Sequence, residues 1–387
     1  MSTRPSAPPL DELRRRTSSK WSTHPDDVLP LFIAEMDYQL APVVADAIIA
    51  RVRASDVGYA GDSGTVGPAF AGFADRRWGW RVSPDDVTLT TDVSVVIVET
   101  LRTAIAPGDG VVLMPPVYPP FFELIPEAGG RVVEVPLLET PAHGSSAWRM
   151  DLDGVEGALA EGARAILLCH PHNPLGLVHP AADLARLAEL AAAYDATVVS
   201  DEIHAPLVHP GAGFTPFLAV SDAAREIGIA AHSASKAFNL AGAKCAFMVA
   251  ASDRTRAIIA RQPDEVRYRA SLLGRAATEA AFGHGDEWLD ATIEVIGESL
   301  DLLEKLLAQH LPGVGYTRPQ ASYLAWLDFR EAGLGDNPGI PILERARVAL
   351  HYGPAFGKPG AGFARLNVAC SPEVLTEAIE RIATVVP

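Results

Sequence analysis

The stretch "HSASKAFNLAGAKC", residues 232–245, carries two lysines, Lys236 and Lys244, eight positions apart. Lysine is otherwise scarce, with three more in a chain of 387 residues. The runs "GIAAHS" (228–233) and "CAFMVA" (245–250) flank the stretch, and their short length and apolar content are typical of buried strands. Lys236 therefore follows the end of a predicted strand, a common place for a functional side chain.

These two runs belong to a longer alternation between about residues 85 and 250. Four more runs predict strands: "GVVLMP" (110–115), "RVVEVP" (131–136), "RAILLCH" (164–170) and "TVVSDEI" (197–203). Residues 94–106 and 181–195 show helical patterns between them. Strands that alternate with helices predict an α/β fold, with a mainly parallel sheet and helices on both faces. Ligands bind such sheets at the carboxyl ends of the strands.

A smaller α+β domain is predicted beyond about residue 285. Residues 287–311 form one long amphipathic pattern, suited to a helix that links two domains. Residues 321–329 and 363–370 read as strands, and residues 371–386 read as a closing helix with Ser371 at its N-cap.

The N-terminal region contributes to both parts. Residues 1–30 are polar and rich in proline and arginine, so they read as an irregular arm, and residues 41–54 read as a helix. The expected division is an N-terminal arm with part of the small domain (1–45), a large ligand-binding domain (46–285) and a small C-terminal domain (286–387).

Composition excludes some classes of function. The formal net charge of −16 argues against sequence-independent binding to nucleic acid or to anionic membranes. No run approaches the length of a transmembrane span or of a signal-peptide core. The three cysteines lie in apolar stretches and fit no zinc motif, so we expect buried free thiols, a cytoplasmic protein and no metal site.

Polar residues follow three of the predicted strands. Asn173 follows "RAILLCH", Asp201 and His204 follow "TVVS", and Lys236 follows "GIAAHS". Taken singly, an Asn-Pro pair is a turn, an aspartate after a strand is a cap, and a lysine is solvated. Together, a lysine, a carboxylate and an amide at one sheet edge suit a site for pyridoxal 5′-phosphate.

The chemistry of that cofactor explains the residue types. The lysine can bind the cofactor aldehyde covalently, the carboxylate can keep the pyridine nitrogen protonated, and the amide can donate to the ring O3′. The phosphate favours hydroxyls, a cation and a helix N-terminus. Val93 and Ser94 lie where the helix in "TTDVSVVIVETL" should begin, and Ser233 and Lys244 flank Lys236.

The lysine stretch resembles the motif of the fold type I pyridoxal phosphate enzymes, the aspartate aminotransferase superfamily. Within it, the chain is similar to the cystathionine β-lyase-like C–S lyases from about residue 28 onward. The other segments with this similarity are "LFIAEMDY" (31–38), "MPPVYPPFF" (114–122), "CHPHNPLGLV" (169–178), "VVSDEIHAPLV" (198–208), "QASYLAWLDFR" (320–330) and "ARLNVACSPEVLTEAIERI" (364–382). The resemblance implies a sheet of the seven-stranded type found in pyridoxal phosphate transferases.

The resemblance also implies roles for single residues. Lys236 would hold the cofactor and move protons, Asp201 would pair with the pyridine nitrogen, and Tyr118 would stack on the ring. Asn173 and His204 would lie near O3′, and Val93, Ser94, Ser233 and Lys244 would hold the phosphate. Arg365 would bind the substrate α-carboxylate, and Ala34 and Glu35 would line the substrate side through their backbone. Tyr59 would reach across the interface of a homodimer to the cofactor phosphate of the other subunit.

Several positions depart from the family pattern. Asp92 stands where the phosphate loop usually has glycine, and a carboxylate there is unfavourable unless it turns away or caps the helix. Glu35, Phe73, Pro206 and Phe214 also replace usual residues. We expect some of these positions to lie near the substrate entrance, where they would affect substrate identity.

The motifs favour Cβ–S cleavage of cystathionine or related cysteine S-conjugates, which yields pyruvate, ammonia and a thiol. A class I/II aminotransferase would use the same residues, so it stays an alternative. A regulatory protein that uses the fold as a binding module and a cofactor-free α/β protein are further alternatives.

Overall fold

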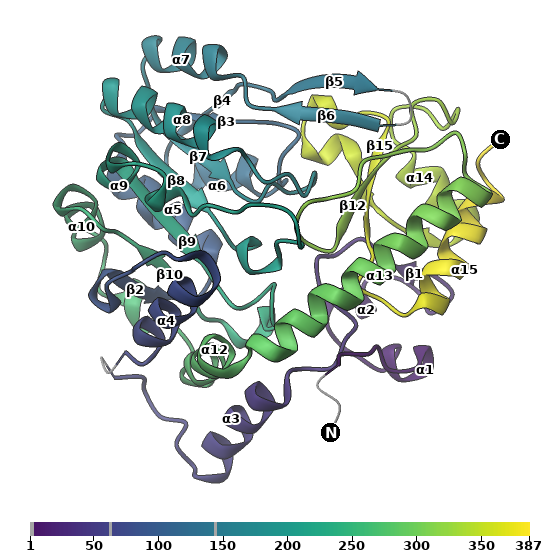
Figure 1. Cartoon of the computed structure of the whole chain (residues 1–387), viewed down its shortest axis with the longest axis horizontal. Coiled ribbons are helices and arrows are strands. Elements are labelled where there is room, and N and C mark those ends of the chain that lie inside the picture. The colour runs from purple at the N-terminus through teal and green to yellow at the C-terminus, as the bar shows by residue number, and fades with distance from the viewer. Residues whose placement is uncertain (1–3, 62–63, 143–144) are drawn as a thin grey trace.

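The computed structural model of the chain describes residues 4–61, 64–142 and 145–387. Figure 1 shows a large sheet with its helices on one side of the molecule and a smaller part, built from both ends of the chain, on the other. The long helix α13 (Asp286–His310) runs diagonally between them. The exact domain boundaries stay a prediction.

The central sheet has seven strands in the order β2-β10-β9-β8-β7-β3-β4. Their bounds are β2 (Val87–Thr90), β3 (Gly110–Leu113), β4 (Arg131–Glu134), β7 (Ala163–Cys169), β8 (Thr197–Asp201), β9 (Gly228–His232) and β10 (Ala246–Val249). The pairs from β9 to β4 are parallel, and β10 is antiparallel to both of its neighbours. The prediction of a mainly parallel sheet is confirmed.

The continuous apolar runs arise because both faces of the sheet are covered. In β7, Ile166 and Leu168 belong to one hydrophobic core, and the alternate residues Leu167 and Cys169 belong to a second core on the opposite face. Helix α8 (Ala181–Ala193) packs into the first core, and α5 (Val93–Ala104) packs into the second. Helices therefore cover both faces, as predicted.

The smaller part is built on a four-stranded antiparallel sheet. Its order is β11 (Gly315–Tyr316), β12 (Leu324–Asp328), β15 (Phe363–Asn367) and β14 (His351–Tyr352). Helix α15 (Pro372–Ala383) closes the chain, and the Ser371 side chain caps it by accepting a hydrogen bond from the Val374 N–H. Strands β12 and β15, the closing helix and its cap agree with the predictions, whereas the two-residue strands β11 and β14 were not predicted.

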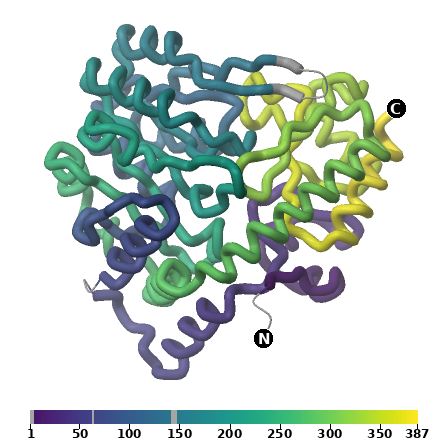
Figure 2. Tube along the Cα trace, in the orientation of Figure 1, coloured from purple at the N-terminus to yellow at the C-terminus, as the bar shows by residue number. Residues whose placement is uncertain are grey.

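The N-terminal segment joins the C-terminal part of the chain. Strand β1 (Leu29–Pro30) pairs in parallel with β13 (Val348–Ala349), and Figure 2 shows the purple N-terminal segment beside the yellow C-terminal one. The expectation of an irregular arm was wrong in part, because short helices α1 (Leu10–Leu13) and α2 (Ser19–Ser22) form there. Tertiary burial of Trp21 stabilises α2, and a four-residue pattern is too short to predict it.

Two further features of the fold have no recognisable signal in the sequence. Strand β2 and the hairpin of β5 (Leu138–Ala142) and β6 (Ser145–Arg149) were not predicted. The remaining helices are α3 (Pro42–Arg53), α4 (Val66–Trp78), α6 (Phe121–Glu127), α7 (Leu152–Ala160), α9 (Asp222–Ile227), α10 (Asp253–Ala260), α11 (Glu265–Tyr268), α12 (Leu272–His284) and α14 (Gly339–Pro341). Among the described residues, no helix combines the length and the apolar character needed to cross a membrane.

Candidate active site

A cavity of about 500 Å³ opens where the carboxyl ends of β7, β8 and β9 meet the smaller sheet. Its walls contain most of the predicted site residues: Ala34, Val93, Ser94, Tyr118, Asn173, Asp201, His204, Ser233, Lys236, Lys244 and Arg365. A cavity of this size suits a small-molecule ligand or cofactor. Parallel strands bring residues from distant parts of the chain to one edge of the sheet, which is why the ends of the predicted strands located Asn173, Asp201, His204 and Lys236.

Lys236 lies in the turn after β9, and its side chain is partly buried. Its Nζ donates a hydrogen bond to the Ala34 carbonyl oxygen at 2.9 Å. Burial, with a further contribution from the Arg365 charge, lowers the pKa of this amine to about 8. A lysine with a lowered pKa supplies more neutral amine near neutral pH, and the neutral form acts as nucleophile or base.

Asp201, the last residue of β8, is a buried carboxylate that lines the same cavity as the buried imidazole of His204. Its Oδ1 accepts a hydrogen bond from the Ile203 N–H at 3.1 Å, and burial raises its pKa to about 6. It forms no ion pair with any described residue, so a cationic ring nitrogen would suit it. Burial lowers the pKa of the nearby His204 to about 3, so this imidazole is neutral.

Arg365, in β15, is held by neutral acceptors at the opposite end of the cavity. Its Nη1 donates to Asn173 Oδ1 at 2.9 Å, and its Nη2 donates to the Phe32 carbonyl at 2.8 Å and to His351 Nδ1 at 3.0 Å. Because Asn173 Oδ1 accepts from an arginine, the amide nitrogen of Asn173 is free to donate to a ligand. Burial lowers the pKa of Arg365 to about 10, and the guanidinium stays charged near neutral pH.

The other end of the cavity is formed by the N-terminus of α5 and by Lys244. Val93 and Ser94 begin the helix, as predicted, and their position suits a phosphate. Lys244 Nζ pairs with Asp92, at 3.0 Å from Oδ1 and 3.3 Å from Oδ2. Asp92 occupies the N-cap position of α5, but its side chain makes no capping hydrogen bond and lines the cavity, where Lys244 balances its charge.

Ser233 was predicted to bind the phosphate, but backbone groups already form hydrogen bonds with its hydroxyl. Its Oγ donates to the Cys245 carbonyl at 2.7 Å and accepts from the Ser235 N–H at 3.1 Å. Two hydroxyl residues that the sequence reasoning missed, Thr91 and Ser235, also line this end. Each is adjacent to a predicted phosphate residue or loop, and the preference of phosphate for hydroxyls could have singled them out.

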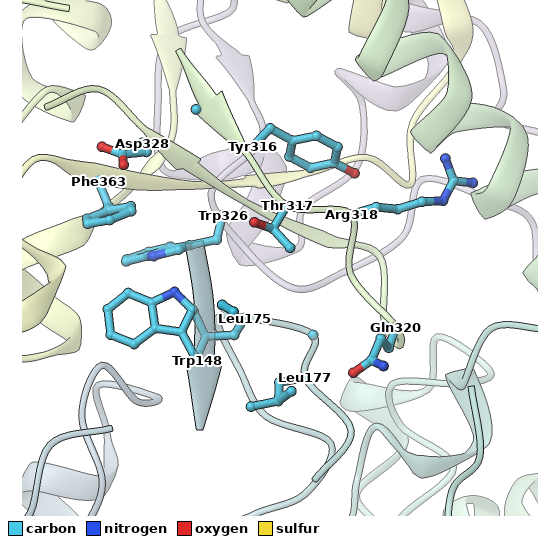
Figure 3. A pocket seen from close by; sticks show the side chains of 13 residues that line it. Trp148, Leu175, Leu177, Tyr316, Thr317, Arg318, Gln320, Trp326, Asp328 and Phe363 are labelled. Carbon is cyan, nitrogen blue, oxygen red and sulfur yellow. The ribbon is translucent and has the colours of Figure 1, made fainter. Parts of the chain in front are cut away.

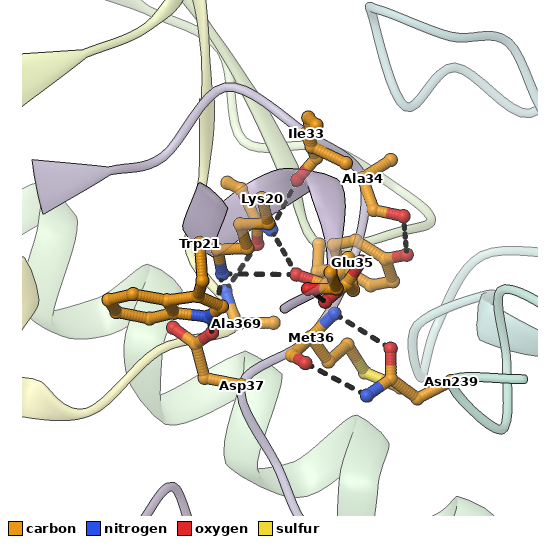
Figure 4. Close-up of polar contacts among 12 residues, drawn as sticks. Lys20, Trp21, Ile33, Ala34, Glu35, Met36, Asp37, Asn239 and Ala369 are labelled. Atoms are coloured by element: carbon orange, nitrogen blue, oxygen red, sulfur yellow. Dashed lines mark hydrogen bonds and ion pairs between the residues drawn. The ribbon is translucent and has the colours of Figure 1, made fainter. Parts of the chain in front are cut away.

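A buried ion pair fixes the segment that carries the Ala34 carbonyl (Figure 4). Lys20 and Asp37 are both fully buried, and Lys20 Nζ lies 2.8 Å from Asp37 Oδ1. Lys20 also donates to the Glu35 carbonyl at 3.1 Å, and Trp21 Nε1 donates to the same Asp37 oxygen at 3.0 Å. The N-terminal helix α2 thus supports the cavity wall from behind, which the sequence reasoning missed.

The same segment is tied to the lysine loop. Asn239 donates to the Met36 carbonyl at 2.8 Å, and its Oδ1 accepts from the Met36 N–H at 3.0 Å. The hydroxyl of the fully buried Tyr323 donates to the Ala34 carbonyl at 3.0 Å, so this oxygen accepts from two side chains. These contacts hold Lys236 in a defined position before any ligand binds.

Two predicted residues lie outside the cavity walls. Tyr59 is fully exposed, at 105% relative accessibility, and borders a different surface hollow, so its role toward another subunit stays a prediction. Glu35 accepts a hydrogen bond from Ser18 Oγ through its side chain, and its carbonyl accepts from Lys20 and from Asn367. The expected contact between the Glu35 backbone and a substrate therefore has no support in the structure.

Most of the departures from the family pattern also lie away from the cavity. Phe73 is in the hydrophobic core, Pro206 is buried in a short turn, and Phe214 packs between Trp78 and His170. None of these three side chains lines the cavity. Asp92 is the departure that does line the cavity.

A second, smaller cavity of about 100 Å³ lies between the hairpin and the smaller sheet (Figure 3). Trp148, Trp326, Phe363 and Leu175 line it, and none of the predicted site residues does. It lacks a lysine and a helix N-terminus, so the chemistry belongs to the larger cavity.

The donor set of the larger cavity fits pyridoxal phosphate. His204 Nδ1 is buried and has no partner in the described ranges, which suits a ligand that supplies one. Tyr118 presents a partly buried ring, edge-to-face with Phe121 at a centroid distance of 5.4 Å. Lys236 and Asp201 supply the amine and the carboxylate, and α5 with Lys244 supplies the phosphate end.

Comparison with known proteins identifies the family. The model for aminotransferase class I and II matches residues 32–382. A candidate cystathionine β-lyase of Mycobacterium leprae is 42% identical over 96% of each chain, and the cystathionine β-lyase of Corynebacterium glutamicum is 36% identical over 98% of this chain and 99% of that one.

Structural comparison agrees with these sequence matches. The crystal structure of a candidate pyridoxal phosphate-dependent β-cystathionase from Corynebacterium diphtheriae superimposes with a TM-score of 0.91, at 36% identity over 99% of both chains. The resemblance to the cystathionine β-lyase branch is confirmed. The chain therefore belongs to the aminotransferase class I and II family.

Proposed function

We propose that the protein is a pyridoxal phosphate-dependent C–S β-lyase that cleaves cystathionine or related cysteine S-conjugates to pyruvate, ammonia and a thiol. The observation that carries the proposal is the placement of Lys236, Asp201, Asn173 and Arg365 around one cavity. The names of the similar proteins support the lyase reaction and the cofactor.

The residues that line the cavity have separate roles in the proposed reaction. When bound, pyridoxal phosphate supplies an electron-accepting ring that stabilises negative charge at the substrate Cα. Asp201 holds a proton at the pyridine nitrogen, and Asn173 orients the ring through its free amide nitrogen. Arg365 binds the α-carboxylate and so places the substrate Cα within reach of Lys236.

Lys236 is the proposed base. Its lowered pKa lets the neutral amine take the Cα proton. The Cα–H electron pair then forms the Cα=Cβ double bond, and the electron pair of the breaking Cβ–S bond leaves with the thiolate. Within hydrogen-bond distance of the amine lies the Ala34 carbonyl, which can accept the hydrogen of the protonated form. β-Elimination follows because the substrate carries a sulfur leaving group on Cβ, and it requires no catalytic residue beyond those used by an aminotransferase.

An aminotransferase would use the same lysine, carboxylate and arginine, so a direct assay must separate the two reactions. Purified holoenzyme is incubated with L-cystathionine without any keto acid, and pyruvate and free thiol are measured. We expect both products in equal amounts. Turnover that requires an added keto acid, with no thiol released, would contradict the lyase proposal and support the aminotransferase.

We further propose a cytoplasmic homodimer. Large apolar side chains are exposed along α3 and the segment after it, at Ile49, Val52, Val57 and Tyr59, and a second subunit would cover them. The three cysteines are buried free thiols, which suits a reducing compartment. Light scattering should give twice the chain mass of 41.0 kDa, and a monomer that is active at all concentrations would contradict the assembly.

A further inference from the structure

His351 is a cavity residue that neither the motifs nor the reaction accounts for. It lies in β14, directly opposite Arg365 in the antiparallel pair of β14 and β15. Its Nδ1 lies 3.0 Å from Arg365 Nη2, and its ring packs edge-on against Phe356 at a centroid distance of 4.8 Å. These contacts fix the imidazole plane beside the proposed carboxylate site.

The contact with Arg365 determines which ring nitrogen carries hydrogen. A guanidinium has donors and no acceptor, so His351 Nδ1 must be the acceptor. A neutral imidazole with an accepting Nδ1 carries its hydrogen on Nε2. Burial and the Arg365 charge lower the pKa of His351 to about 3, so the ring stays neutral in any ordinary assay buffer.

The Nε2 hydrogen is available to a ligand. No acceptor in the described part of the chain takes it, and Nε2 is not among the buried atoms that lack a partner, so it remains open to solvent. His351 lines the cavity, and Phe32, Ile33 and Phe121 contribute apolar side chains to the walls of the same cavity. An acceptor on a substrate would lose hydrogen bonds to water against those walls and would need a replacement donor.

The N–H groups of Arg365 do not supply this replacement donor. The guanidinium has five N–H donors, and three are bonded to Asn173, Phe32 and His351, which leaves two for the α-carboxylate. The Nε2 hydrogen of His351 is a further donor, displaced from Arg365 by the width of the ring. It therefore suits an acceptor beyond the α-carboxylate, on the part of the substrate that leaves with sulfur.

We propose that His351 is a specificity-determining residue: its Nδ1 positions Arg365, and its Nε2–H binds a carboxylate or carbonyl at the far end of the leaving group. The preferred substrates are then cysteine S-conjugates with a distal acceptor, such as cystathionine, over conjugates with a plain alkyl group. This inference rests on the proposed lyase function.

The test compares L-cystathionine with S-methyl-L-cysteine in the holoenzyme and three variants. His351→Asn places an amide oxygen near the Nδ1 position but cannot reach the Nε2 position, and His351→Phe removes both contacts. His310→Asn, at the end of α13 and away from the cavity, is the matched control.

We expect the ratio of kcat/KM for cystathionine over S-methylcysteine to fall about tenfold in both His351 variants, the size of one lost hydrogen bond. The KM for S-methylcysteine should rise more in His351→Phe than in His351→Asn, because the asparagine still positions Arg365. The control should keep the wild-type ratio.

An unchanged ratio in His351→Asn would overturn the contact with the leaving group. Equal KM values for S-methylcysteine in the two variants would overturn the positioning of Arg365. Equilibrium binding of both amino acids, read from the change in cofactor absorbance, gives the same comparison without turnover. Failure of the lyase function is distinct, since wild-type enzyme would then release no pyruvate from either compound.

Discussion

The two ends of the active-site cavity each present a cation, but they balance its charge differently. Arg365 is 2% exposed, and its bonds go to neutral acceptors, with no carboxylate partner among the described residues. Lys244 has a side chain that is 55% exposed, and it pairs with Asp92. The end that we propose binds the substrate is therefore poised for an anion, whereas the end that we propose binds the cofactor phosphate is already partly neutralised.

The difference matters because burial changes the strength of a charge. A buried, uncompensated guanidinium attracts a carboxylate strongly, since little water screens it. An exposed lysine in an ion pair must give up part of that pair before it can serve a phosphate, and such pairs are weak. We therefore expect the substrate end to be more sensitive to mutation than the cofactor end.

The largest effect should come from Arg365→Gln. Loss of two charge-assisted hydrogen bonds to the α-carboxylate should raise KM about 100-fold, at about 3 kcal/mol, while the cofactor stays bound. Steady-state kinetics with cystathionine and the cofactor absorbance measure the two quantities. Arg318→Gln, at a surface ion pair with Asp301, is the control. A similar KM in both variants would remove Arg365 from the substrate site.

A smaller effect is expected from Lys244→Met at the other end. Removing one exposed cation should weaken cofactor affinity about tenfold, with little change in the chemistry once the cofactor is saturating. Fluorescence titration of the cofactor-free protein measures the dissociation constant. A Lys244→Met variant that keeps full cofactor affinity but loses turnover would contradict the proposed role of Lys244 at the phosphate. Lys305→Met, on the exposed side of α13, provides the reference.

Asp92→Asn should act in the opposite direction. It removes a carboxylate that competes with phosphate for Lys244, so cofactor affinity should rise about threefold, within the range of exposed ion pairs. In the double variant with Lys244→Met, the gain in cofactor affinity from Asp92→Asn should largely disappear. A benefit that persists there would mean that Asp92 repels the phosphate directly rather than through Lys244.

The smallest effect is a shift in pH dependence. In the cofactor-free protein, the rate of covalent attachment of added pyridoxal phosphate should rise with pH and level off above about pH 8, as the Lys236 amine becomes neutral. Arg365 lowers this pKa and Asp201 raises it. The plateau should therefore move to higher pH in Arg365→Gln and to lower pH in Asp201→Asn. Shifts of the same sign would contradict these charge effects.

The part of the site that depends on local order along the chain could be predicted from the sequence. Asn173, Asp201 and Lys236 each follow an apolar run, and the rule that parallel strands end at one edge brings them together. Both faces of the sheet are covered, so the runs are continuous and easy to recognise. Arg365 came from the family resemblance alone, because one arginine among many has no local signal.

Contacts between distant segments could not be predicted in this way. His351 lies in a two-residue strand without periodicity, and its role depends on pairing with β15. Lys20 meets Asp37 because both segments fold under the cavity wall, and no spacing rule joins them. The pairing of Lys244 with Asp92 depends on the left-handed backbone of Lys244, at φ 57°, which sequence patterns do not specify.

The central claim is that Lys236, and not Lys244, is the residue that binds the cofactor covalently. Holoenzyme reduced with borohydride is digested and analysed by peptide mass spectrometry, with Lys236→Ala as the control. The account predicts a cofactor mass on the peptide at Lys236, and none in the variant. A label on Lys244 or another lysine, or a protein that takes up no cofactor, would contradict it.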